Sequence, residues 1–354
     1  MNMNKSRVPL AVALLFGAPA IYAADVVSFS ETVLKTSATD PDLVNPWGIS
    51  ESAGSPFWVS DNGTGKTTLY NSAGVKQGLV VSMPAGSENL TGQVFNGTAA
   101  NFNADTFIFA TENGTITGWR GALGTTAETL FSVAGAEYKG LAISNDKTTL
   151  YGADFAKGTI DVFTSAGLKS SIADPNIPAG FAPFNIQNIN GKLYVTYAKV
   201  GPTGDDVAGA GNGFVSVFNP VAGTFTRVIT QGSLDSPWGI AIAPNSFGTV
   251  GGDLLVGNFG DGLINAYDPI SGGLVGTLAT FDGAPIVNDG LWALQFGNGG
   301  TGGLAGSLYI TAGPNDETGG VFARIDAVPE PSAFLLSAVG LTAFVLRRRS
   351  IANR

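Results

Sequence analysis

The sequence contains no cysteine and no histidine. Without cysteine the chain can form no disulfide, no thiolate metal site and no cysteine nucleophile. Without imidazole it can build neither a Ser-His-Asp triad nor a histidine-ligated zinc site, and no side chain of ordinary pKa titrates near neutrality. These two absences exclude most of the common hydrolase and metalloenzyme chemistries.

Charged residues are also scarce, at 13% of the chain, and acidic residues outnumber basic ones by 27 to 18. Several of the basic residues lie in the two terminal segments, so the interior is more acidic than the formal net charge of −9 indicates. An acidic domain repels phosphate backbones, and we therefore expect no nucleic-acid partner.

Glycine and apolar residues, by contrast, are abundant. The chain has 50 glycines, and 44% of its residues are hydrophobic. Many glycines together with β-branched and aromatic residues favour short strands and tight turns over helices. The composition predicts an all-β fold with a large core, and one such domain can reach this length.

Residues 1–24 have the pattern of a secretory signal peptide. A basic start with Lys5 and Arg7 precedes an apolar stretch over 8–20, and small residues follow up to Ala24. These are the three regions of a cleaved export signal, which is removed from the mature protein. We therefore leave this segment out of the fold.

The C-terminal segment 328–354 also has three parts. A Pro-Glu-Pro segment precedes an apolar run over 333–346, and three arginines follow at once. As a helix this run is about 21 Å long, short against a hydrocarbon core of about 30 Å, and the arginines favour the cytoplasmic side. We expect a short hydrophobic sorting helix that associates transiently with the inner membrane. The residues of the signal are Val328, Pro329, Glu330, Pro331, Arg347, Arg348 and Arg349.

This layout resembles the PEP-CTERM sorting signal of Gram-negative bacteria. The resemblance implies that an exosortase, a membrane transpeptidase-like enzyme, recognises and cuts the tail. It also implies that the protein is exported to the cell surface or the extracellular matrix. The alternative interpretation is a simple C-terminal membrane anchor.

Between the two ends, one unit of about four strands repeats six times. The apolar second strands align best, at 57–62, 107–113, 150–154, 193–197, 254–258 and 308–312. Third strands follow at 68–71, 115–120, 159–164, 214–219, 263–268 and 320–325. Inner strands are clear at 46–49, 139–143, 237–242 and 289–294, while the copies near Gly97 and Phe184 are degenerate. Four strands per unit at this period predict a six-bladed β-propeller over 25–327.

The sixth unit lacks an outer strand of its own, and a strand over 26–34 precedes the first unit. We expect this N-terminal strand to complete the last blade. Such pairing closes the ring and removes exposed strand edges, which promote aggregation.

The repeat resembles that of NHL-type and related six-bladed propellers, in the segments 47–49, 59–65 and 69–74 and their copies. Some six-bladed propellers similar to this one, the gluconolactonase-like family, are calcium-dependent hydrolases. In that family, acidic or Asn residues before the inner-strand glycine point into the channel. Here Asp289 matches that pattern beside Asn288, whereas Trp47, Lys139 and Trp238 occupy the equivalent positions. Calcium needs several converging oxygen ligands, so these positions fit a metal site poorly.

Three tryptophans lie at inner-strand starts, and two interpretations remain open for them. Trp47, Trp238 and Trp292 could form, with Lys139 and Asp289, a ligand-binding surface at the channel mouth. They could equally pack as buried wedges between blades, because large aromatic side chains are usually buried.

The sequence therefore favours an exported, surface-sorted, non-enzymatic propeller without a cofactor, which binds a glycan or an envelope protein or interacts with the extracellular matrix. Two alternatives remain. One is a calcium-dependent lactonase or esterase built around Asp289 and Asn288, and the other is a structural envelope component.

Overall fold

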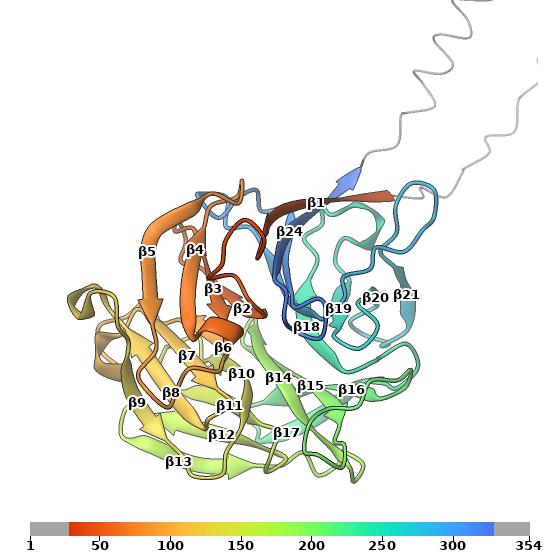
Figure 1. Cartoon of the computed structure of the whole chain (residues 1–354). Coiled ribbons are helices and arrows are strands. Elements are labelled where there is room, and N and C mark those ends of the chain that lie inside the picture. Colours follow the sequence, from red (N-terminus) through yellow and green to blue (C-terminus); the bar gives the residue numbers. More distant parts are fainter. Residues whose placement is uncertain (1–27, 329–354) are drawn as a thin grey trace, which may run out of the picture.

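The computed structural model describes residues 28–328. In this part of the chain, six four-stranded antiparallel sheets are arranged radially around a central channel (Figure 1). The sequence-based prediction of an all-β, six-bladed propeller is confirmed. No helix within residues 28–328 has the length and apolar character needed to cross a membrane.

Each of the first five blades is built from consecutive strands, counted outward from the channel. Blade 1 contains β2 (Pro46–Ser50), β3 (Phe57–Asp61), β4 (Lys66–Tyr70) and β5 (Lys76–Ser82). Blade 2 contains β6 (Leu90–Phe95), β7 (Phe107–Thr111), β8 (Thr115–Trp119) and β9 (Glu128–Ser132). Blade 3 contains β10 (Tyr138–Ile143), β11 (Leu150–Asp154), β12 (Thr159–Thr164) and β13 (Gly167–Ile172).

Blade 4 contains β14 (Phe181–Ile189), β15 (Lys192–Lys199), β16 (Gly213–Asn219) and β17 (Thr224–Thr230). Blade 5 contains β18 (Pro237–Ile242), β19 (Leu254–Asn258), β20 (Ile264–Tyr267) and β21 (Leu274–Thr277). Blade 6 contains β22 (Leu291–Phe296), β23 (Leu308–Ala312), β24 (Val321–Val328) and, as its outermost strand, β1 (Ser28–Thr36). Four short 3-10 helices lie in loops: η1 (Asn62–Thr64), η2 (Phe102–Ala104), η3 (Gly121–Leu123) and η4 (Gly248–Val250).

The two ends of the described chain pair with each other. β1 runs antiparallel to β24, with Ser28 opposite Val328 and Thr36 opposite Val321 (Figure 1). Phe29 of β1 is buried and packs on Phe247 at a ring-centroid distance of 4.9 Å. The predicted closure of the last blade by the N-terminal strand is therefore confirmed, although Val26 and Val27 lie outside the described residues.

The predicted second strands all form, and their side chains supply the apolar core between blades. In β3, β7, β11, β19 and β23 every residue is buried, which is why these strands read as apolar runs. One inner strand lies elsewhere than expected: in blade 2 it is β6 and ends at Phe95, so Gly97 falls in the loop after it. In β6 the repeated inner-strand glycine is Gly92.

The inner-strand glycines are explained by how closely neighbouring blades approach at the channel. A Cβ atom on Gly48 would lie 2.6 Å from the Thr91 carbonyl oxygen, and one on Gly92 would lie 2.4 Å from the Leu141 nitrogen. A Cβ on Gly239 would lie 2.4 Å from the Trp292 oxygen. Only glycine allows these backbones to come so close, so the repeated glycine is a packing requirement of the ring.

A candidate binding site in the central channel

Every inner strand carries a β-bulge at the same level of the channel. In each blade the pairing with the second strand slips by one residue at this point, between Pro46 and Ile49 in blade 1 and between Leu291 and Leu294 in blade 6. A bulge redirects the side chain of its extra residue. The first residues of the six bulges, here called the bulge ring, are Trp47, Thr91, Lys139, Phe184, Trp238 and Trp292, and all are at least 95% buried.

This register places Asp289 differently from the sequence alignment. The sequence analysis aligned Asp289 and Gly290 with Trp47 and Gly48, but Leu291 pairs with Ala312 as Pro46 pairs with Asp61, so Trp292 is the counterpart of Trp47. Gly290 has a φ of +64° and lies in the turn before the strand. Alternation of apolar residues could not reveal this three-residue offset.

Three indoles of the bulge ring fill the middle of the channel. Trp47 stacks on Trp292 with ring centroids 3.6 Å apart, and Trp238 meets both edge-on at 6.1 and 5.9 Å. Phe259 also stacks on Trp292, with ring centroids 4.2 Å apart. These side chains divide the channel into two ends, and each end has its own polar surroundings.

Hydrogen bonds fix two of the three indoles in place, while the buried Trp47 Nε1 has no hydrogen-bond partner among the described residues. Trp238 Nε1 donates to the Lys139 carbonyl oxygen across the channel, and Trp292 Nε1 donates to Asn45 Oδ1, both at 2.9 Å. The structure thus brings Trp47, Lys139, Trp238 and Trp292 together as the sequence suggested. The three tryptophans are only 1–4% exposed, and their role in ligand binding stays a prediction.

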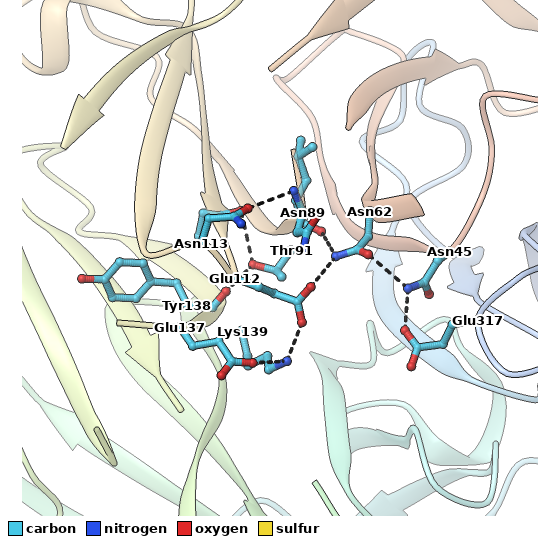
Figure 2. Close-up of polar contacts among 12 residues, drawn as sticks. Asn45, Asn62, Asn89, Thr91, Glu112, Asn113, Glu137, Tyr138, Lys139 and Glu317 are labelled. Atoms are coloured by element: carbon cyan, nitrogen blue, oxygen red, sulfur yellow. Dashed lines mark hydrogen bonds and ion pairs between the residues drawn. The ribbon is translucent and has the colours of Figure 1, made fainter. Parts of the chain in front are cut away.

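At the end of the channel where the inner strands begin, polar side chains form a connected network around Lys139 (Figure 2). Lys139 Nζ lies 5.4 Å from the centre of the Trp47 ring and makes ion pairs with Glu112 and, at 2.6 Å, with Glu137. Asn62 Nδ2 donates to Glu112 Oε2 at 3.0 Å. Burial alone would lower the pKa of Lys139, but the two carboxylates outweigh it and raise this pKa.

Two loops bring further carboxylates to this network. Glu317, from the loop between β23 and β24, accepts a hydrogen bond from Asn45 Nδ2 (Figure 2). Asp206, from the loop between β15 and β16, is close enough to Lys139 to interact with its charge. Burial raises the pKa values of both Glu317 and Asp206. The network end of the channel thus gathers four carboxylates around Lys139.

Asp289 supports this network from outside the channel. Its Oδ2 accepts a hydrogen bond from the backbone nitrogen of Asn315 at 3.0 Å. Asn315, Asp316 and Glu317 all have positive φ values, between 50° and 62°, which are strained for residues other than glycine. The Asp289 carboxylate therefore holds the turn that presents Glu317.

Asn288 and Asp289 do not converge on one point. Asn288 lies beside Glu31 of β1, where its side chain opposes the rise that burial produces in the pKa of Glu31. Within residues 28–328, no three acidic side chains lie close enough to hold a metal ion together. The calcium site that these two residues would form stays an untested alternative.

At the other end of the channel the inner strands leave a cavity of about 260 Å³. All six inner strands border it, and Trp238 of the bulge ring is part of its wall. The polar side chains of its wall are mostly amides: Gln93, Asn145, Asn185, Gln187, Asn188 and Gln295, with Ser50, Glu51 and Lys147. The sequence analysis named none of these nine residues, because each looks like an ordinary polar position of a strand or of a neighbouring loop.

The amides differ in how far the protein already uses them. Gln93 is fully engaged, since its Nε2 donates to the Gly48 and Trp58 carbonyls and its Oε1 accepts from Ser50. Gln295 donates to Glu51 and to the Phe296 carbonyl. Burial raises the pKa of Glu51 to about 8 against the effect of Gln295, and burial lowers the pKa of Lys147.

Comparison with known proteins identifies a sorting motif in the tail and finds relatives of the chain. Residues 327–349 match the model of the PEP-CTERM protein-sorting motif. The chain is also 35% identical to protein R648 of Acanthamoeba polyphaga mimivirus across 284 residues, which cover 72% of this chain and 69% of the relative. Protein L690 of the same virus is also 35% identical, over 72% of this chain and 74% of the relative. The chain belongs to this protein family.

Solved structures share the fold of the family at low sequence identity. A streptogramin B lyase superposes with a TM-score of 0.52 at 12% identity, over 85% of this chain and 98% of the lyase. Virginiamycin B lyase from Staphylococcus aureus gives the same TM-score at 14% identity, over 85% of this chain and all of the lyase. Likeness at this level extends to the propeller fold alone.

The sorting motif connects directly to the closing blade. The matched region begins at Ala327, which pairs with Phe29 in the last blade, and Val328 ends β24. Pro329, Glu330, Pro331, Arg347, Arg348 and Arg349 lie outside the described residues, as does the predicted signal peptide over 1–24. This member of the family is an exported propeller with a PEP-CTERM sorting signal.

Proposed function

We propose that this protein is a non-enzymatic binding module of the cell surface or extracellular matrix, and that its ligand enters the central cavity. The observation that supports this proposal is the difference between the two ends of the channel. At the network end Lys139 and its two glutamates pair with one another, with side-chain exposures of 7% for Lys139 and 22–26% for the glutamates. The cavity end instead offers open space lined by polar side chains.

Gln187 is the cavity residue best suited to contact a ligand. It lies on β14, is half-buried, and its side chain forms no hydrogen bond to another described residue. An amide carries two donor hydrogens and an acceptor oxygen, so Gln187 has capacity for a ligand that the fold does not use. Ligand sites in propellers and barrels commonly occupy such concave openings with a few free polar groups.

The sorting signal supplies the setting for this function. An exosortase-type enzyme would process the tail, and the short apolar run would hold the protein transiently at the inner membrane before release. A glycan or an envelope protein would then meet the propeller outside the cell. No feature of the described residues favours the calcium-dependent hydrolase or the purely structural component over this role.

A cavity-filling variant tests the proposal. Mature protein and its Gln187→Trp variant would be applied to glycan arrays and to extracellular-matrix extract, and retained material would be measured. We expect the native protein to bind and Gln187→Trp to lose binding, because an indole would occupy the cavity. Gln77→Trp, a glutamine on the outer strand β5, is the matched control and should bind normally.

Two results would contradict the proposal. The first is equal binding by the native protein and Gln187→Trp, which would place the ligand elsewhere. The second is the absence of any retained component, together with a tight calcium site in a calorimetric titration. That second result would favour the hydrolase alternative.

A further inference from the structure

We infer that the central cavity binds a neutral, hydroxyl-rich molecule of about the size of a hexose, such as one uncharged sugar unit of a glycan. This inference rests on the proposed function, since it names the chemistry of the ligand for that same cavity. It follows from three features of the wall: its amides, its lack of strong charge, and one indole.

The amides match hydroxyl groups. Each hydroxyl of a polyol can donate one hydrogen bond and accept others, and each primary amide offers both a donor and an acceptor. The free groups of the wall include the whole Gln187 amide and the oxygen of Gln295, whose nitrogen is already engaged. The wall thus offers a ligand both a donor and acceptors.

The two titratable groups of the wall are isolated from each other. Glu51 accepts from Gln295, and no ion pair joins it to Lys147 or to any other described residue. Burial shifts the pKa values of both groups toward their uncharged forms. An anionic ligand would have to give up its hydration to pair with Lys147, whose pKa burial lowers, and a cationic ligand would meet Glu51, whose pKa burial raises, so either charge would be bound at a cost.

Size and the indole complete the fit. The cavity volume of about 260 Å³ is far above the roughly 10–15 Å³ that a single buried water needs. Trp238 borders the cavity although it is only 4% exposed, and Asn185 Nδ2 donates a hydrogen bond to its backbone oxygen at 2.9 Å. Apolar residues of the wall, among them Ile49, Val94 and Ile186, add surface on which the C–H face of a sugar ring can pack while its edges form hydrogen bonds.

The test compares matched neutral and charged sugars. Glucose and galactose, glucuronate and glucosamine would be titrated into mature protein at pH 7, with isothermal calorimetry and tryptophan emission as readouts. We expect at least one neutral hexose to bind at least fivefold more tightly than both charged sugars. Emission should change because Trp238 borders the cavity.

Variants locate the site. Gln187→Ala should weaken binding of the neutral hexose at least tenfold, because it removes the free amide. Gln77→Ala on β5 should leave binding within twofold of the native value. Thermal unfolding of both variants would show that each retains the native fold.

The outcomes separate this inference from the proposed function. Tighter binding of glucuronate or glucosamine than of neutral hexoses would overturn the inference. The inference would also be overturned if a matrix component lost its binding in Gln187→Trp but was not displaced from the native protein by neutral hexoses at high concentration. In that case the proposed function would still stand. Loss of hexose binding in Gln187→Ala but not in Gln77→Ala supports both.

Discussion

The indoles of Trp47 and Trp292 stack across the junction between the first and the last blade, with their ring centroids 3.6 Å apart. Trp47 lies on β2 and Trp292 on β22, so residues 245 positions apart in sequence meet at the centre of the ring. The Trp47–Trp292 pair joins the first and the last blade at the channel, and the pairing of β1 with β24 joins the two ends of the ring at its outer edge. Ring closure is therefore secured twice, once by backbone pairing and once by aromatic packing.

Removing one indole of this pair should destabilise the whole propeller. Trp292→Ala deletes a side chain that is 1% exposed, and such a change costs about 3–5 kcal/mol of unfolding free energy. Urea unfolding followed by circular dichroism would measure the loss. Trp119→Ala, at a half-buried position on β8, should cost clearly less; equal costs would contradict the central role of the stacked pair.

The closing strand should be sensitive to a charge at its buried position. Phe29→Asp places a carboxylate against Phe247, where it is desolvated and unpaired, and should open the last blade. We expect faster proteolysis of β1 and a tendency to aggregate from the exposed edge of β24. Thr32→Asp, exposed on the same strand and opposite Arg324, should remain as protease-resistant as the native protein.

Lys139 should matter through the carboxylates that it neutralises. Lys139→Met leaves Glu112 and Glu137 without their counter-ion, and a loss of about 2 kcal/mol in unfolding free energy is expected. Burial lowers the pKa of Lys139, but the two carboxylates outweigh it and raise this pKa in the folded state, so folding favours the charged lysine. This stabilisation is fully present below the ordinary pKa of 10.5 and is lost as the pH rises through the higher folded-state value. The deficit of the variant at pH 7 should therefore shrink at strongly alkaline pH, and an undiminished deficit there would contradict this account.

Glu51 should make the protein less stable at alkaline pH. Its pKa is raised by burial to about 8 in the folded state, above the ordinary value of 4.5, so folding favours the protonated form. The penalty is absent below the unfolded pKa and increases as pH rises from 4.5 to 8. Glu51→Gln should therefore raise the urea midpoint at pH 8 and leave it unchanged at pH 4.

A matched exposed position separates this effect from general charge removal. Glu88→Gln, on an exposed loop residue, should shift the midpoint little at either pH. A stabilisation of Glu51→Gln that is equally large at pH 4 would show that desolvation of the carboxylate is not its cause.

Local sequence determined the strands of this propeller, because a buried strand needs an apolar run and a turn needs residues that accept positive φ. The second strands were predicted to within two residues at each end, and the third strand of blade 3 was predicted at its observed bounds, Thr159–Thr164. The missing outer strand of the last unit also determined the closure by β1. The C-terminal motif could be recognised from sequence because the residues that define it follow one another along the chain.

Tertiary structure alone decided the candidate site. The bulges that set the register of Trp292 depend on pairing with a second strand some twenty residues away, so the sequence alignment put Asp289 in its place. Glu317 and Asp206 reach Lys139 from loops whose course no local pattern dictates. The amides of the cavity come from strands of different blades, and only closure of the ring turns them toward one space.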